Sequence, residues 1–100
     1  MLLNLDGRYR RSGNLVSREI HEEMLLIPIK DNVGDMGRIY SLNGVGAFIW
    51  ELLDGTRRVL DIKQMVVEEF DVSPQEAEKD LLAFLRDLQE LGATVVESPG

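Results

Sequence analysis

The sequence predicts a single α+β domain in which short strands come first and helices follow. One hundred residues is a typical size for one domain, and a composition of 44% hydrophobic and 29% charged residues fits a globular protein. Apolar residues partly alternate with polar ones before residue 42 and recur at helical spacing after it. Strands and helices that are segregated along the chain in this way indicate an α+β layout.

The first part of the chain predicts a flexible arm and three strands. Residues 1–14 contain glycines, asparagines and three arginines without a sustained apolar period, so we expect a flexible N-terminal arm with a solvated arginine cluster. Residues 15–30 supply β-branched and aliphatic side chains that predict two strands joined near residues 21–23. DNVGDMG is a turn sequence, and the alternation that follows it predicts a third strand over residues 38–42.

Two helices are expected between residues 43 and 70. Asn43 can accept the N-terminal hydrogen bond of a helix in GVGAFIWELLDG, which Gly55 would end. A second helix is expected from about Leu60 to Phe70, because its apolar residues recur at helical spacing.

The third helix has the clearest start. Ser73 is a suitable N-cap, Pro74 occupies the first helical position, and Glu76 can complete a capping box. A continuous apolar face runs from Ala77 to Leu91, and Gly92 supplies a left-handed residue to end the helix. ATVV predicts a short strand after it, and residues 97–100 a C-terminal tail.

The chain carries no recognisable catalytic apparatus. It has no cysteine, which excludes disulfides, thiolate metal sites and cysteine nucleophiles. His21 is the only histidine, and the GVG at residues 44–46 lacks the Gly-Lys-Ser/Thr of a phosphate loop. We therefore expect a binding module that is not an enzyme and uses no metal or cofactor.

Charge and hydropathy restrict the partners and the location. The net charge is −7, and all of the excess negative charge lies in residues 51–100, which argues against a nucleic-acid partner. No apolar run approaches the roughly 20 residues that span a bilayer, and the first residues lack the order of a secretory signal. A cytoplasmic protein that does not contact membranes is expected.

Three features bear on binding. The strand at residues 38–42 follows a glycine-containing loop and is a candidate sheet edge, to which another strand can be added. Leu82 lies off the main apolar face of the third helix, with Glu78 and Arg86 along the same side, and either meets a partner or widens the buried stripe. Trp50 either packs beneath the sheet, which is favoured, or is partly exposed for a partner.

Four segments together resemble the PqqD family, named for pyrroloquinoline quinone synthesis protein D. They are LLIPI, RIYSLNGVGAFIWELLDG, TRRVLDIKQMVVEEF and FLRDLQELGATVV, within residues 15–96. The most specific part is a strand-to-helix signature made by Tyr40, Leu42, Asn43, Gly46, Ile49, Trp50, Leu53, Asp54 and Gly55. The resemblance implies one peptide-recognition domain over residues 15–96, with a small three-stranded antiparallel sheet followed by a three-helix, winged-helix-like bundle.

The same resemblance implies a function and a site. Members of the family capture the leader of a ribosomally made precursor peptide and deliver it to a radical S-adenosylmethionine enzyme. The leader is added as a strand beside the third strand and lies against the third helix. By this resemblance, the peptide-binding residues here are Gly37, Arg38, Ile39, Tyr40, Ser41, Glu78, Leu82 and Arg86.

Some alternatives stay open at this point. Pyrroloquinoline quinone biosynthesis is the leading pathway among several that use PqqD-like domains. A winged-helix DNA-binding regulator is the alternative function, although the third helix carries more acidic than basic residues. A structural subunit that docks on a larger enzyme is another alternative, and an open strand edge also allows a homodimer.

Overall fold

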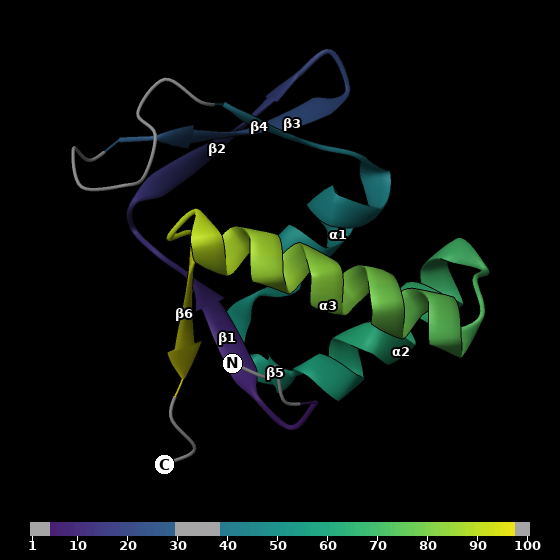
Figure 1. Ribbon diagram of the computed structural model, residues 1–100. Helices are drawn as coiled ribbons and strands as arrows, with labels where there is room; N and C mark the ends of the chain where they lie inside the picture. Colours follow the sequence, from purple (N-terminus) through teal and green to yellow (C-terminus); the bar gives the residue numbers. More distant parts are fainter. Residues whose placement is uncertain (1–4, 30–38, 98–100) are drawn as a thin grey trace.

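The structure is a computed structural model that describes residues 5–29 and 39–97. Within these residues the chain forms β1 (Arg8–Arg11), β2 (Leu15–Ile20), β3 (Glu23–Pro28), β4 (Tyr40–Leu42), α1 (Gly44–Leu52), β5 (Asp54–Arg58), α2 (Val59–Phe70), α3 (Pro74–Glu90) and β6 (Thr94–Glu97). The strands pair into two antiparallel three-stranded sheets, in the orders β2-β3-β4 and β5-β1-β6. Figure 1 shows α1 and α3 between the two sheets, and α2 beside β5. The predicted α+β fold is confirmed.

The core is built around one stripe of α3. Ala77, Leu81, Leu85 and Leu88 are at most 1% exposed, and their spacing of three or four residues places them on one side of the helix. They pack with fully buried residues of the other elements, among them Leu26, Ile49, Leu53, Val59 and Ile62. The rotation of α3 about its own axis is therefore fixed by side chains that are almost completely buried.

The predicted helix starts are confirmed. The Asn43 side chain accepts a hydrogen bond from the Gly46 amide at 2.7 Å, and the Ser73 side chain accepts one from the Glu76 amide at 3.1 Å. A side chain at Gly46 would have its Cβ 3.3 Å from Asn43 Oδ1, so glycine lets the helix start pack closely. α3 ends before Gly92, whose φ of +73° is the left-handed conformation that was expected.

The hairpin of β2 and β3 has the predicted position. His21 and Glu22 both have positive φ, which is typical of the two-residue turns that match the twist of a hairpin. The Leu26 side chain of β3 points into the core, while the side chains of Leu25 and Ile27 lie on the opposite face of the sheet. The third strand is shorter than predicted and begins at Tyr40.

A second sheet was not predicted, and it corrects the expectation of a flexible N-terminal arm. Residues 8–11 form β1, the central strand of the sheet, which pairs with β5 on one side and β6 on the other. Tyr9 is only 5% exposed and belongs to the core. The arm was predicted because β1 has a single buried apolar residue among arginines, which leaves no alternation to recognise.

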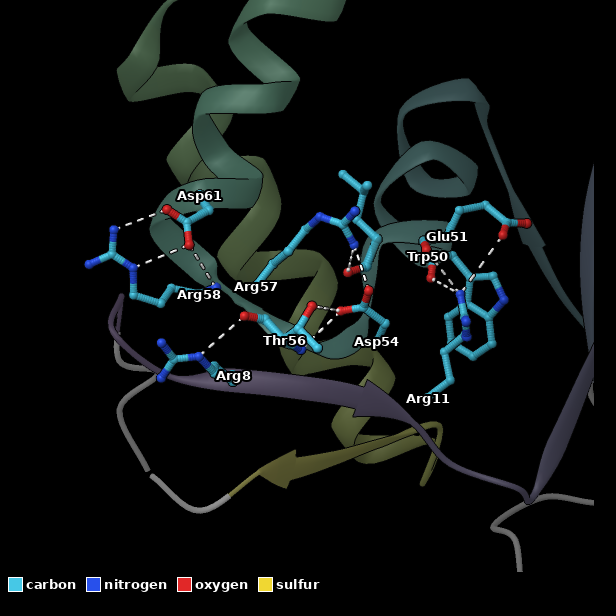
Figure 2. A network of polar contacts seen from close by, with 10 residues as sticks. Arg8, Arg11, Trp50, Glu51, Asp54, Thr56, Arg57, Arg58 and Asp61 are labelled. Carbon is cyan, nitrogen blue, oxygen red and sulfur yellow. Dashed lines mark hydrogen bonds and ion pairs between the residues drawn. The ribbon is translucent and has the colours of Figure 1, made fainter. Parts of the chain in front are cut away.

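The arginines of β1 bind neighbouring elements, so the expectation that they are only solvated is also wrong (Figure 2). Arg11 donates from Nη1 to the carbonyl oxygens of Trp50 and Glu51, at 2.9 and 3.1 Å. These carbonyls lie in the last turn of α1, where backbone acceptors have no partner within the helix. Trp50 is 3% exposed, so it packs in the interior as favoured. Arg10 forms an ion pair with Glu97 of β6 at 2.6 Å.

A tight turn at the start of β5 ends α1 earlier than predicted. Gly55 does not close the helix, because α1 ends at Leu52 and Gly55 lies in β5 with a φ of +86°. The Asp54 carboxylate accepts hydrogen bonds from the amide and hydroxyl of Thr56, at 2.9 and 2.7 Å, and from Arg57 at 2.7 Å (Figure 2). These bonds, of which the one from the Thr56 hydroxyl contributes most, lower the pKa of Asp54 to about 2.

None of the helices in the described residues is long and apolar enough to cross a bilayer.

We expect the Tyr9→Ala substitution to lower the free energy of unfolding by about 3 kcal/mol, as for truncation of a buried aromatic side chain. The measurement is equilibrium denaturation in urea. Ile20→Ala serves as the control, because Ile20 is 46% exposed, and should cost less than about 1 kcal/mol. A flexible arm would instead give no measurable effect for Tyr9→Ala.

We expect Thr56→Val to raise the pKa of Asp54 from about 2 toward its ordinary value of 3.8, whereas Thr56→Ser, which keeps the hydroxyl, leaves it low. The carboxyl carbon shift of Asp54 followed by NMR measures this directly. Since the pKa is lowered in the folded state, the stabilisation is complete above pH 3.8 and is lost as the pH falls toward 2. The stability difference between wild type and Thr56→Val should shrink over that range, and a difference independent of pH would contradict the assignment.

Candidate functional site

β4 is an edge strand of its sheet. Within the described residues, β3 is its only strand neighbour, through the pairs Met24 with Leu42, Leu25 with Ser41 and Leu26 with Tyr40. An edge strand presents backbone N–H and C=O groups along its unpaired side. The prediction that the third strand offers an open edge is therefore met by the described residues.

An open hollow of about 380 Å³ lies between β4, the start of α1 and α3. It is lined by Tyr40, Ser41, Leu42, Asn43, Val45, Gly46, Ile49, Asp80, Ala83, Phe84 and Asp87. We call this hollow the β4–α3 groove. Its lining combines apolar side chains from α1 and α3 with an edge strand, and Figure 1 shows α3 passing beneath the sheet that contains β4.

Tyr40 and Asp87 connect the two walls of the groove. The Tyr40 hydroxyl donates to Asp87 Oδ2 at 3.3 Å. Partial burial raises the pKa of Tyr40, and the neighbouring negative charge of Asp87 and the hydrogen bond to it act in the same direction. The phenol therefore stays protonated at neutral pH and remains a donor to the carboxylate.

The sequence-predicted residues of the third helix do not line this groove. Glu78 faces α2, where its carboxylate accepts a hydrogen bond from the Lys63 ammonium at 3.0 Å. Leu82 is partly buried and packs against the core cluster, as the alternative of a wider buried stripe expects. Arg86 is exposed one turn further along the same side.

The groove wall is a different face of α3. Asp80, Ala83, Phe84 and Asp87 are centred about 150° around the helix from Leu82, at about 100° per residue. The buried stripe runs between these two faces. The expectation that Leu82 and its neighbours face the third strand therefore differs from the structure, because both flanks of a buried stripe look alike in sequence and only packing shows which one meets β4.

The sequence-predicted strand residues are close to the groove where they are described. Tyr40 and Ser41 line it. Ile39 is 58% exposed beside the start of β4. Gly37 and Arg38 lie outside the described residues. Contact of any of these residues with a peptide stays a prediction.

Sequence reasoning missed the α3 side of the groove. Asp80 and Asp87 are among the acidic residues of the third helix that argue against a DNA partner, and Phe84 lies within the apolar face from Ala77 to Leu91. The spacing of residues 80, 83, 84 and 87 is itself a helical face, which is the signal that could have identified them.

The groove has the groups for binding an extended peptide. An added strand gains main-chain hydrogen bonds from a sheet edge, and its alternate side chains enter pockets beside it. In residues 5–29 and 39–97, no group of three or more His, Cys, Asp or Glu side chains is placed to hold a metal ion.

Comparisons with known proteins identify one matching family and two similar solved structures. A family model described as "Coenzyme PQQ synthesis protein D (PqqD)" matches residues 1–93. The match includes the segment that had been expected to lie outside the domain as an arm. The comparison with curated proteins found no match.

Two solved structures are similar over most of the chain. One, described as "TbiB1 in Complex with the TbiA(beta) Leader Peptide", is 30% identical with a TM-score of 0.67, and the match covers 91% of this chain and 98% of that one. The other, described as "Lasso peptide synthetase B1 complexed with the leader peptide", shares the fold, with 24% identity, a TM-score of 0.72, and coverage of 88% and 98%. The family match spans residues 1–93 and confirms the family that the sequence resemblance indicated, so this chain belongs to the PqqD family.

Proposed function

We propose that this protein binds the leader of a ribosomally made precursor peptide in the β4–α3 groove and presents it to a modifying enzyme. The observation that carries the proposal is an edge strand facing a helix across an open groove. Family membership and similarity to a leader-bound structure at 30% identity support it. In this proposal the protein positions the precursor peptide, and the modifying enzyme catalyses the reaction.

The leader is expected to extend the sheet as a fourth strand beside β4. Its backbone would pair with the free side of residues 40–42, and every second side chain would point toward α3. Apolar leader side chains would contact Val45 and Phe84, which line the groove and are only partly buried. Burial of such side chains gives affinity, and the backbone pairing fixes the register.

The DNA-binding alternative gains no support. The matching family is described as a coenzyme PQQ synthesis protein, and both similar structures are described as complexes with leader peptides. The exposed residues of α3 also include acidic side chains at positions 76, 80, 87 and 90, which repel a phosphate backbone.

A matched pair of substitutions tests where the leader binds. Ala83→Trp places a large side chain in the groove, whereas Arg86→Trp introduces the same side chain on the other exposed flank of α3. We expect Ala83→Trp to raise the Kd at least about tenfold, as for occlusion of a central contact, and Arg86→Trp to change it less than about twofold. Fluorescence anisotropy of labelled leader peptides, taken from precursor genes beside this gene, measures both.

The reverse result would show that the leader binds the face of α3 that the sequence resemblance implied. If Arg86→Trp abolished binding and Ala83→Trp did not, the leader would lie along Glu78, Leu82 and Arg86. Circular dichroism of both variants establishes that a loss of binding is not a loss of fold.

The second partner is a modifying enzyme, and a radical S-adenosylmethionine enzyme is the class that the family resemblance implies. We expect such an enzyme, encoded beside this gene, to co-elute with the protein and leader in size-exclusion chromatography as a ternary complex. Ala83→Trp should remove the leader from that complex while the enzyme and this protein still co-elute. Failure of the wild-type protein to associate with the enzyme would remove the radical enzyme from the proposal and leave leader binding in place.

A further inference from the structure

The described residues that line the β4–α3 groove carry charge of only one sign. Among the described residues, its two charged lining residues are Asp80 and Asp87, and none of the lysines or arginines of residues 5–29 and 39–97 lines it. Neither aspartate forms an ion pair with another described residue. Other acidic residues of the chain, such as Asp54 and Asp61, are paired with arginines. Within the part of the chain that the structure describes, the groove therefore presents two carboxylates without an ion-pair partner to whatever enters it.

The two aspartates flank an apolar patch on the same wall. They are seven residues apart on α3, which is about 10 Å along the helix axis at about 1.5 Å per residue. Ala83 and Phe84 lie between them, and Ile49 also lines the groove. Along the axis of α3, the groove wall therefore consists of an acidic residue, an apolar patch and a second acidic residue.

An added strand would present its side chains to this wall at a fixed spacing. Side chains on the same face of a strand are about 7 Å apart, because successive residues point to opposite faces. A side chain that meets the apolar patch therefore has its same-face neighbours two residues before and after it. If the added strand runs along α3, those neighbours reach toward the two ends of the patch, where the aspartates are.

Resting on the function proposed above, we propose that the groove selects a leader segment in which an apolar residue has a lysine or arginine two residues before it, after it, or both. The basic side chain pairs with Asp80 or Asp87. Asp87 accepts one hydrogen bond from Tyr40 and, as a carboxylate, retains sites for a further donor. Long basic side chains also cover apolar surface with their methylene groups while the charged end reaches the carboxylate.

Three synthetic peptides test the selection. They share one sequence with a central leucine, and they carry lysine, glutamine or glutamate at both positions two residues from it. We expect the lysine peptide to bind about three- to tenfold tighter than the glutamine peptide, as for partly exposed charge pairs, and the glutamate peptide to bind weakest. The preference should decrease as salt is added, because the pairs are accessible to screening.

A charge-matched pair of variants locates the effect. Asp80→Asn combined with Asp87→Asn should reduce the preference for lysine over glutamine to less than about twofold. Glu68→Gln combined with Glu69→Gln on α2 changes the net charge equally, but neither residue lines the groove, and it should keep the full preference. Amide-shift mapping on residues 39–42 and 80–87 verifies where each peptide binds.

The outcomes separate this inference from leader binding itself. If all three peptides bound the groove equally, or if the α2 variant lost the preference as fully as the groove variant, the selection would be wrong and the groove would remain a peptide site. If no peptide shifted the signals of residues 39–42, selection and binding site would both be overturned. A preference that is lost only in the groove variant establishes the selection.

Discussion

The buried stripe of α3 is the constraint on which the site depends. Ala77, Leu81, Leu85 and Leu88 cannot rotate out of the core without exposing side chains that are at most 1% accessible. Truncating any one of these leucines would cost about 2–5 kcal/mol, a large part of the stability of a domain of this size. With that stripe fixed, one flank of α3 faces β4, and the other carries Glu78, which meets α2, and the exposed Arg86. The groove is thus a consequence of core packing, and its walls are rigid elements.

The second sheet supports the groove from the other side of the molecule. α1 starts directly after β4 and supplies part of the groove lining, so its position matters for the site. Its last carbonyl groups are held by Arg11 of β1, and β1 is in turn paired with β5 and β6. The residues that looked like an arm therefore help to hold the helix that forms one end of the site.

The sequence was informative where local chemistry determines structure. The caps at Asn43 and Ser73, the left-handed Gly92 and the apolar face of α3 could all be predicted, because each depends on neighbouring residues alone. β1 and β5 could not, because Tyr9 is the only buried residue of β1 and the pairing partners are distant in sequence. For the same reason, only one of the two walls of the site could be predicted from the sequence. β4 could be recognised from its sequence, whereas the choice between the two flanks of α3 depends on packing that no local pattern reveals.

The central claim is that the leader forms a strand on the free side of β4. Amide hydrogen exchange of residues 40–42, with and without saturating leader peptide, tests it most directly, since a free edge exposes backbone N–H groups to water and an added strand bonds them. The account predicts slower exchange at β4 on binding, with the outer strand β2 unchanged. Binding that left β4 exchange unaltered would contradict it, and would place the leader elsewhere on the protein.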